Sequence, residues 1–311
     1  MGERANVRPE YERGQSKAGV ADRAAAAVRG LQALPLPAGL YVVATPIGNL
    51  GDITLRALAV LAEADVLYCE DTRHSRTLLN HYALVRPTRP YHEHNAARER
   101  PRVLAELAAG KSVALISDAG TPLVSDPGYK LVRAAAAAGL PVTALPGASA
   151  PLAALVLAGL ATDAFLVAGF LPPRRAARQA RLQALKAVPA SLVFFEAPSR
   201  LADSLGDIAA VLGEREAAVA RELTKLHEEV LRATPTELAQ WAARSMPRGE
   251  MVIVVGPPVA TAMPDAAIAA RLAPLLGAMR LSDAVRTVAR DLGVPRKRVY
   301  DLALALGRKS D

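Results

Sequence analysis

Short apolar runs alternate with helical patterns through the first half of the chain, and this alternation constrains the fold more than any other feature of the sequence. The runs cover residues 40–44, 65–69, 112–117 and 141–145. Strands that alternate with helices pair in parallel, and the helices cover both faces of the resulting sheet. The sequence therefore predicts an α/β domain over residues 39–162, built on a parallel or mostly parallel sheet.

A second set of apolar runs predicts a second sheet. We expect strands at residues 165–169, 191–195, 217–220 and 251–255, with helices near 175–187, 199–212 and 235–244 between them. They form a second α/β domain over residues 163–258. With 311 residues, of which 51% are apolar, the chain can bury a core large enough for two such domains.

Three features of the sequence indicate where the protein is located: its N-terminus, its long uncharged stretch and its cysteine content. Residues 1–38 are rich in Arg, Ala, Gly and Pro without a usable apolar period, so we expect a disordered extension, with order beginning at Gly39. The N-terminal residues are charged where a signal peptide needs an apolar run, so no export signal is predicted. Prolines interrupt the uncharged stretch 134–162, so no membrane span is predicted either. The single cysteine, Cys69, excludes an internal disulfide. We expect a cytoplasmic protein.

The segment SDAGTPLVSDPG, residues 117–128, connects a predicted strand to a predicted helix. Its glycines let a ligand approach the backbone, and Asp118 and Asp126 supply hydrogen-bond acceptors. A phosphate cradle needs donors and usually a basic side chain, and residues 117–129 contain no Lys or Arg. The loop therefore favours a neutral or cationic ligand with ribose hydroxyls. The alternative is a surface turn whose aspartates cap the next helix.

The net charge of +8 is concentrated in two places. One is a predicted helix without acidic residues that carries Arg174, Arg175, Arg178, Arg181 and Lys186. The other is the segment 259–311, which is the most basic part of the chain for its size. Such blocks favour a polyanionic partner, although a solvated helix face is an alternative for either one.

The segment 259–311 is predicted to form a small helical module. Three short helices are expected near residues 264–277, 282–291 and 296–307. In the last pair, Ser282 is the predicted helix cap, a turn follows at residues 292–294, and Pro295 begins a helix that carries Arg296, Lys297 and Arg298. This pattern resembles a helix-turn-helix, and a helical bundle that packs on the second domain is the alternative.

Nine motifs follow one another along the chain: TPIGNLGDIT, EDTRHS, HEHN, SDAGTPLVSDPGY, LPGASA, GFLPPR, FFEAPSRL, RELTKLHEE and RGEMVIVV. Their order and spacing resemble the ribosomal RNA small subunit methyltransferase I family within the tetrapyrrole methylase superfamily. The resemblance covers residues 39–256. It implies a two-lobed α/β fold of the class III methyltransferases, with a cleft between the lobes for S-adenosylmethionine (SAM). It also implies methylation of the ribose 2′-hydroxyl of a decoding-centre cytidine in 16S rRNA, and a homodimer.

The resemblance also implies a set of cofactor-binding positions, of which Asp118 is the acceptor that we consider first. The set consists of Pro46, Gly48, Asp118, Ala119, Gly120, Thr121, Leu123, Ser149, Ala150, Phe195, Glu196, Ala220, Arg221, Glu222, Leu223, Glu250 and Met251. The first strand is followed by TPIGNLG and not by a GxGxxG motif, which argues against a dinucleotide site of the Rossmann type.

A ribose hydroxyl has a high pKa, so a nearby base or cation should assist its methylation. The candidates lie in two polar loops: Glu70, Asp71 and Arg73 in the first, and His92, His94 and Asn95 in the second. For Glu70 and Asp71 the alternative is an ion pair with Arg73 or a helix cap. His92 and His94 lack a further His or Cys cluster, so no metal site is predicted.

Phosphate contacts with the RNA are assigned to basic residues on two helices and one loop. They are Arg174, Arg175, Arg178, Arg181, Lys225, Arg296, Lys297 and Arg298.

One competing hypothesis keeps the fold and replaces the RNA by a precorrin-type tetrapyrrole. Another is a DNA-binding regulator that reads DNA with residues 281–306, and it leaves most of the chain unexplained.

Overall fold

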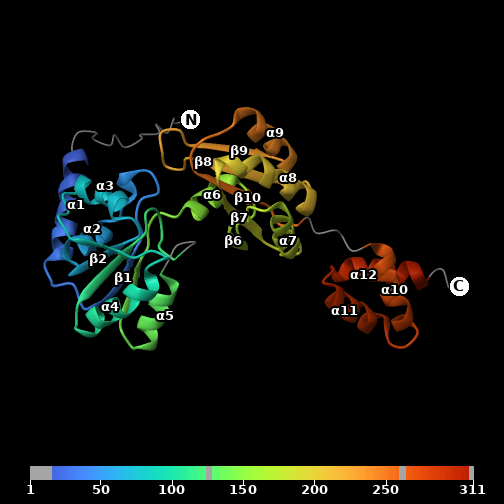
Figure 1. Cartoon of the computed structure of the whole chain (residues 1–311). Coiled ribbons are helices and arrows are strands. Elements are labelled where there is room, and N and C mark those ends of the chain that lie inside the picture. Colours follow the sequence, from blue (N-terminus) through green and yellow to red (C-terminus); the bar gives the residue numbers. More distant parts are fainter. Residues whose placement is uncertain (1–15, 124–127, 259–263, 308–311) are drawn as a thin grey trace, which may run out of the picture. The chain divides into compact units, whose positions relative to one another are not determined.

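Five strands form the first sheet, in the order β3-β2-β4-β1-β5, and every pair is parallel. The structure is a computed structural model that describes residues 16–123, 128–258 and 264–307 (Figure 1). The strands are β1 (Gly39–Val43), β2 (Val66–Cys69), β3 (Thr88–Pro90), β4 (Ser112–Ile116) and β5 (Val142–Leu145). The predicted α/β fold is confirmed. The edge strand β3 was not predicted, because three residues that include a proline give no strand pattern.

Helices cover both faces of this sheet, as expected for parallel strands. They are α2 (Leu55–Glu63), α3 (Thr72–His81), α4 (Ala96–Ala108) and α5 (Tyr129–Ala137), and a 3-10 turn, η1 (Leu50–Asp52), precedes α2. Side chains of α2 and α3 pack on one face, around Leu61 and Leu79, and those of α4 and α5 pack on the other, around Val103 and Leu131. Thr54 caps α2 by accepting a hydrogen bond from the backbone nitrogen of Ala57 at 3.1 Å.

The second sheet is mixed, in the order β6-β7-β10-β8-β9. Its strands are β6 (Phe165–Phe170), β7 (Ser191–Glu196), β8 (Ala217–Arg221), β9 (Glu229–Ala233) and β10 (Met251–Val255). Only β6 and β7 are parallel; the other pairs are antiparallel. The sequence predicted four of these strands and missed β9, whose five residues include two charged side chains and are only partly buried or exposed.

One face of the second sheet is covered by α7 (Arg175–Leu185), α8 (Leu201–Leu212) and α9 (Pro235–Ser245), with η2 (Pro198–Arg200) leading into α8. The other face is covered by α6 (Ala150–Ala158), which follows β5 of the first sheet. Ala154, Leu155 and Ala158 of α6 share a buried apolar cluster with Val193 and Val252 of the second sheet. This packing joins the two lobes.

The N-terminal extension is partly ordered, which corrects the expectation that order begins at Gly39. Residues Ser16–Gln32 form α1, which contacts α2, and Gln32 donates a hydrogen bond to Glu63 at 3.1 Å. Alanine, the strongest helix former, is abundant in this segment, but the segment lacks a continuous apolar stripe, so the apolar pattern did not reveal the helix.

The C-terminal residues 259–311 form a separate unit with its own core. Its helices are α10 (Asp265–Leu276), α11 (Leu281–Leu292) and α12 (Arg296–Gly307), and they bury Ile268, Leu272, Val285, Val288 and Val299. Ser282 was predicted to cap α11 but lies inside it, since Arg280 occupies the cap position. Gly293 ends α11 with φ of +62°, a conformation that favours glycine.

None of the described helices is both long and apolar enough to cross a membrane. The uncharged stretch 134–162 is divided among the end of α5, the strand β5 and the helix α6.

The basic helix α7 presents only some of its arginines to solvent, which corrects one predicted RNA contact. Arg178 is 4% exposed, and its Nε donates to Oδ2 of Asp207 at 2.7 Å. Arg175 and Gln179 donate to the other oxygen of Asp207. Burial raises the pKa of Asp207, but these hydrogen bonds outweigh burial and hold the pKa below its usual value. Arg178 therefore holds α7 on α8 and is not available to phosphate.

We predict that Arg178→Ala lowers the free energy of unfolding by about 3 kcal/mol, because it leaves the buried Asp207 carboxylate without its best partner. The control is Arg181→Ala on the same helix, an exposed position where the change should stay within about 0.5 kcal/mol. Urea unfolding of both variants measures the difference. Equal losses in the two variants would contradict the structural role of Arg178.

Candidate functional site

The polar loops of the first lobe meet at the edge of the sheet where its parallel strands end. Thr45 follows β1, Glu70 follows β2, and Ser117 and Asp118 follow β4. Thr45 and Gly120 exchange backbone hydrogen bonds of 2.9 and 3.0 Å, which join the first loop to the third. Ligands of open α/β sheets bind at this edge.

A cavity of about 380 Å³ lies between this edge and the second lobe. The first lobe contributes polar groups, among them Glu70, Asp118, Thr121 and Ser149, and the second lobe contributes Phe170, Phe195, Met251 and Val252. The Phe170 and Phe195 rings lie 5.3 Å apart. No Lys or Arg is present among the described residues that line this first cavity. It is of the size that small-molecule sites have, with one acidic wall and one apolar wall.

A second cavity of about 330 Å³ adjoins the first. The two share Ile47, Asp118, Ala119 and Glu250. The rest of the second cavity is lined by Thr45, Pro46, Gly48, Leu50, His74, Ser75, Thr77, Leu78, Ile116, Ser117 and Lys225. Unlike the first cavity, it contains a basic side chain.

The structure separates the predicted cofactor-binding residues into three groups. Those that line the first cavity are Asp118, Ala119, Gly120, Thr121, Ser149, Ala150, Phe195, Glu196, Glu250 and Met251. Pro46 and Gly48 line only the second cavity. Those that line neither of these cavities are Leu123, Ala220, Arg221, Glu222 and Leu223. Asp126 lies outside the described residues.

Each residue of the third group has another structural role. Ala220 and Leu223 lie in the apolar cluster beneath α6, and Leu123 packs on the core of the first lobe. Arg221 forms an ion pair with Glu229 at 3.2 Å, and Glu222 forms one with Lys225 at 2.8 Å. The sequence could not show that the side chains of these residues are used for packing and pairing.

Glu196 lines the first cavity, but its carboxylate is already occupied. The group is buried and accepts hydrogen bonds from Nε of Arg200 and the backbone nitrogen of Ala197, both at 2.8 Å, and from Ser204. It therefore fixes the end of β7.

Asp118 and Asp71 play different roles at the strand ends. Oδ1 of Asp118 accepts the backbone N–H of Asp71 at 3.0 Å, which orients the Asp118 carboxylate at the boundary of the two cavities. Asp71 caps α3 and pairs with Arg73 at 3.1 Å. Hydrogen bonds from Arg73 lower the pKa of Asp71 to about 2. These contacts favour a structural role for Asp71, as helix cap and ion-pair partner of Arg73, over the role of a base.

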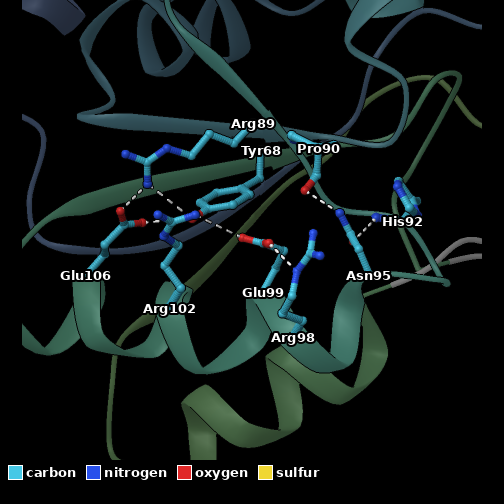
Figure 2. Close-up of polar contacts among 9 residues, drawn as sticks. All are labelled: Tyr68, Arg89, Pro90, His92, Asn95, Arg98, Glu99, Arg102 and Glu106. Atoms are coloured by element: carbon cyan, nitrogen blue, oxygen red, sulfur yellow. Dashed lines mark hydrogen bonds and ion pairs between the residues drawn. The ribbon is translucent and has the colours of Figure 1, made fainter.

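The HEHN segment has a structural role at the start of α4. Oδ1 of Asn95 accepts the backbone N–H of His92 at 2.8 Å, and the Asn95 amide donates to the carbonyl of Pro90 at 2.9 Å (Figure 2). His92 and His94 line neither cavity, so the structure does not bring the candidate His94 to the site. In the described part of the chain, no group of three or more His, Cys, Asp or Glu could hold a metal ion.

Ion pairs continue along the same helix and fix it to the sheet. Figure 2 shows Glu106 of α4 joined to Arg89 of β3 and to the Tyr68 hydroxyl of β2. Glu99 is buried and pairs with Arg98 and Arg102 on its own helix. The polar residues of this region therefore position α4 and lie outside the two cavities.

The sequence analysis missed several lining residues of the first cavity. They are Ile47, Pro151, Phe170, Ala197, Pro198, Gly249 and Val252. Most belong to motifs that carry the family resemblance, such as GFLPPR for Phe170 and RGEMVIVV for Gly249. The motifs pointed to the region, but only the order of the strands shows that Phe170 faces Phe195.

Two loops of the second lobe contact the first lobe beside the second cavity. Thr224 accepts the backbone N–H of Asn49 at 3.1 Å, and Glu222 accepts hydrogen bonds from Lys225 at 2.8 Å and from the backbone of Glu250 at 3.0 Å. Glu222 and Thr224 have positive φ angles of 49° and 65°. Such strained conformations persist only where the surrounding contacts hold them, and they cluster at functional sites.

Family comparisons match both parts of the chain. The family Tetrapyrrole (Corrin/Porphyrin) Methylases matches residues 39–239, and the RsmI C-terminal HTH domain matches residues 262–307. The second match agrees with the helix-turn-helix prediction for the C-terminal unit.

Individual proteins extend this similarity. The chain is 54% identical over 278 residues to the ribosomal RNA small subunit methyltransferase I of Mesorhizobium japonicum. The aligned region covers 89% of this chain and 95% of that protein. It is 49% identical over 269 residues to the protein of the same name from Micromonospora olivasterospora, covering 84% and 85%. The fold resembles that of uroporphyrin-III C-methyltransferase from Thermus thermophilus complexed with S-adenosyl homocysteine, with a TM-score of 0.50, 23% identity, and coverage of 70% and 97%.

We predict that Gly249→Ala lowers the free energy of unfolding by about 1–3 kcal/mol. Gly249 has φ of +93°, and an added Cβ would overlap the Glu222 carboxyl group. The control is Gly206→Ala in the exposed part of α8, where no atom lies within 4 Å of the added Cβ. This control should raise stability by about 0.5–1 kcal/mol, because alanine is the better helix former. A neutral Gly249→Ala variant would show that the two loops do not need their present conformation.

Proposed function

The chain belongs to the ribosomal RNA small subunit methyltransferase I family, and from this premise we propose that it methylates the 2′-hydroxyl of a decoding-centre cytidine in 16S rRNA. The methyl donor is SAM. The observation that carries the proposal is the first cavity, whose acidic and aromatic walls suit a cationic nucleoside and lie beside a second, distinct cavity. The two curated relatives support the RNA as the acceptor. The tetrapyrrole alternative rests on relatives that share only the fold.

The side chains that line the first cavity are chemically suited to SAM. Glu70 and Asp118 of the first lobe supply carboxylates, and no Lys or Arg is among the described residues that line the cavity. Glu250 of the second lobe also lines the cavity, but it pairs with Lys225 at 3.1 Å. Asp118, at the end of β4, offers acceptor oxygens to hydroxyl or amino groups. Phe170 and Phe195 offer flat apolar surface to an adenine ring. The complex of the related Thermus enzyme with S-adenosyl homocysteine supports the same class of ligand.

The residues of the site act mainly by positioning. SAM, held by the residues that line the first cavity, would supply an activated methyl group to the acceptor oxygen. Such a transfer gains most from holding the two reactants in line and in contact. The backbone pair between Thr45 and Gly120 and the hydrogen bond from Asp71 to Asp118 fix the loops around this point. Of the candidate catalytic residues, Glu70 is the one that lines the first cavity, so it is the one that we retain.

Exposed basic residues support an RNA partner. Arg174 before α7 and Arg181 of α7 are exposed, as are Arg296 and Lys297 at the start of α12, and Arg175 is exposed although it pairs with Asp207. Arg298 pairs with Asp265 at 2.6 Å, and Lys225 pairs with Glu222 and Glu250 beside the second cavity, so neither is assigned to phosphate. We assign the contacts with phosphate to the exposed arginines and to the C-terminal unit.

We further propose a homodimer that acts in the cytoplasm on the small ribosomal subunit. Leu152 and Val156 of α6 and Phe165 of the edge strand β6 are exposed apolar side chains. Exposed apolar side chains of this size are frequent at protein interfaces. They support association of two copies through this side of the second lobe.

We predict that the wild-type protein transfers label from tritiated SAM to a cytidine 2′-oxygen of small subunits that lack this modification. Asp118→Ala should lose the transfer and weaken SAM binding at least about tenfold, because it removes a charge-assisted hydrogen-bond acceptor. The control is Asp163→Ala, an exposed carboxylate that lines neither cavity. Calorimetry and mapping of the labelled nucleotide give the two readouts. Label on a base, or no label on any rRNA substrate, would refute the proposed reaction.

A further inference from the structure

The second cavity meets the first along a common wall. Asp118 and Ala119 from the loop after β4, Ile47 from the loop after β1, and Glu250 from the second lobe line both cavities. A transfer between two bound reactants needs two sites that meet at one point. The common wall provides such a meeting point.

The chemical character of the second cavity differs from that of the first. Hydroxyl groups of Thr77 and Ser117, the imidazole of His74 and the ammonium group of Lys225 occur among its lining residues. The first cavity has aromatic side chains and no described basic residue. The second cavity therefore suits a ligand rich in hydroxyl groups, and it places one ammonium group beside the Asp118 and Glu250 carboxylates that it shares with the first cavity.

Lys225 is the best-fixed group of the second cavity. Its Nζ donates to Glu222 at 2.8 Å and to Glu250 at 3.1 Å. Its side chain packs against Gly48, where an added Cβ would overlap the lysine stem and lie 3.0 Å from the carbonyl of Leu223. Burial disfavours the charged form, but the hydrogen bonds to Glu222 and Glu250 outweigh burial and raise the pKa of Lys225. The group remains a cation and does not act as a base.

We propose that the second cavity receives the ribose of the target nucleotide, with the Lys225 ammonium beside the acceptor oxygen. The inference rests on the proposed function and adds to it the place of the acceptor and a residue that acts on it. In the transfer, the bond from oxygen to the methyl carbon forms and the bond from carbon to sulfur breaks, with its electron pair moving to sulfur. The hydroxyl proton leaves to water. A fixed cation favours the negative charge that develops on the oxygen.

Filling the second cavity tests the place of the acceptor. Thr77 is an exposed residue of α3 that lines this cavity, so Thr77→Trp should occupy its space. The matched control is Asn80→Trp, an exposed position on the same helix that lines neither cavity. We expect Thr77→Trp to lower kcat/KM for the small subunit at least about 100-fold and to change the Kd of SAM less than about twofold, because a blocked acceptor cannot reach its in-line position. Asn80→Trp should keep both values.

Each other outcome has a definite meaning. Full activity of Thr77→Trp would place the acceptor elsewhere. Loss of SAM binding in Thr77→Trp, with a melting temperature equal to that of Asn80→Trp, would assign the second cavity to the cofactor. Either result overturns this inference and leaves the proposed function standing, whereas the proposed function itself fails if the wild-type protein labels a base or labels no rRNA substrate.

Substitution of Lys225 tests its role. Lys225→Met should lower kcat by about 100-fold at saturating SAM and subunit, because enzymes that lose one hydrogen-bond donor to a developing negative charge slow by about this factor. Lys225→Arg keeps the cation and should recover most of this loss. A merely structural lysine would instead give equal activities in the two variants, with changes confined to stability, and that result would overturn its assignment to the acceptor oxygen.

Discussion

The packing of α6 on the second sheet is the interaction on which the rest of the structure depends. This helix follows the last strand of the first sheet and buries Ala154, Leu155 and Ala158 against the second. Its first residues, Ala150 and Pro151, line the first cavity. Because the same short helix joins the lobes and forms part of the wall, the distance between the acidic and the aromatic side of the cavity is set by apolar packing beneath it.

In the proposed reaction, the two cavities hold different reactants. One combines carboxylates with aromatic rings, and the other combines hydroxyl groups with a fixed lysine. They meet at Asp118, whose carboxylate is oriented by the backbone of Asp71. Asp71 in turn is held by its cap position and by Arg73. Most charged groups around the site therefore act by holding loops, and few are left to meet a ligand.

The sequence predicted those features that depend on neighbouring residues. The alternation of strands and helices predicted both sheets apart from β3 and β9, and it placed the loop around Asp118 at a strand end, where that loop lines the first cavity. Arg178 was misassigned because its partner Asp207 lies 29 positions away. Phe170 was missed because its neighbour Phe195 is brought beside it by strand pairing. The helix α1 was missed because alanine favours helix without marking a buried face.

The most direct test of this account is an experimental structure of the protein with S-adenosylhomocysteine and a short fragment of 16S rRNA that contains the target cytidine. The account predicts that the adenosyl group lies between Asp118 and the pair Phe170 and Phe195, and that the ribose 2′-oxygen lies in the second cavity near Lys225 and faces the sulfur across Asp118 and Ala119. A cofactor bound in the second cavity, or a target ribose that enters the first lobe elsewhere, would contradict it.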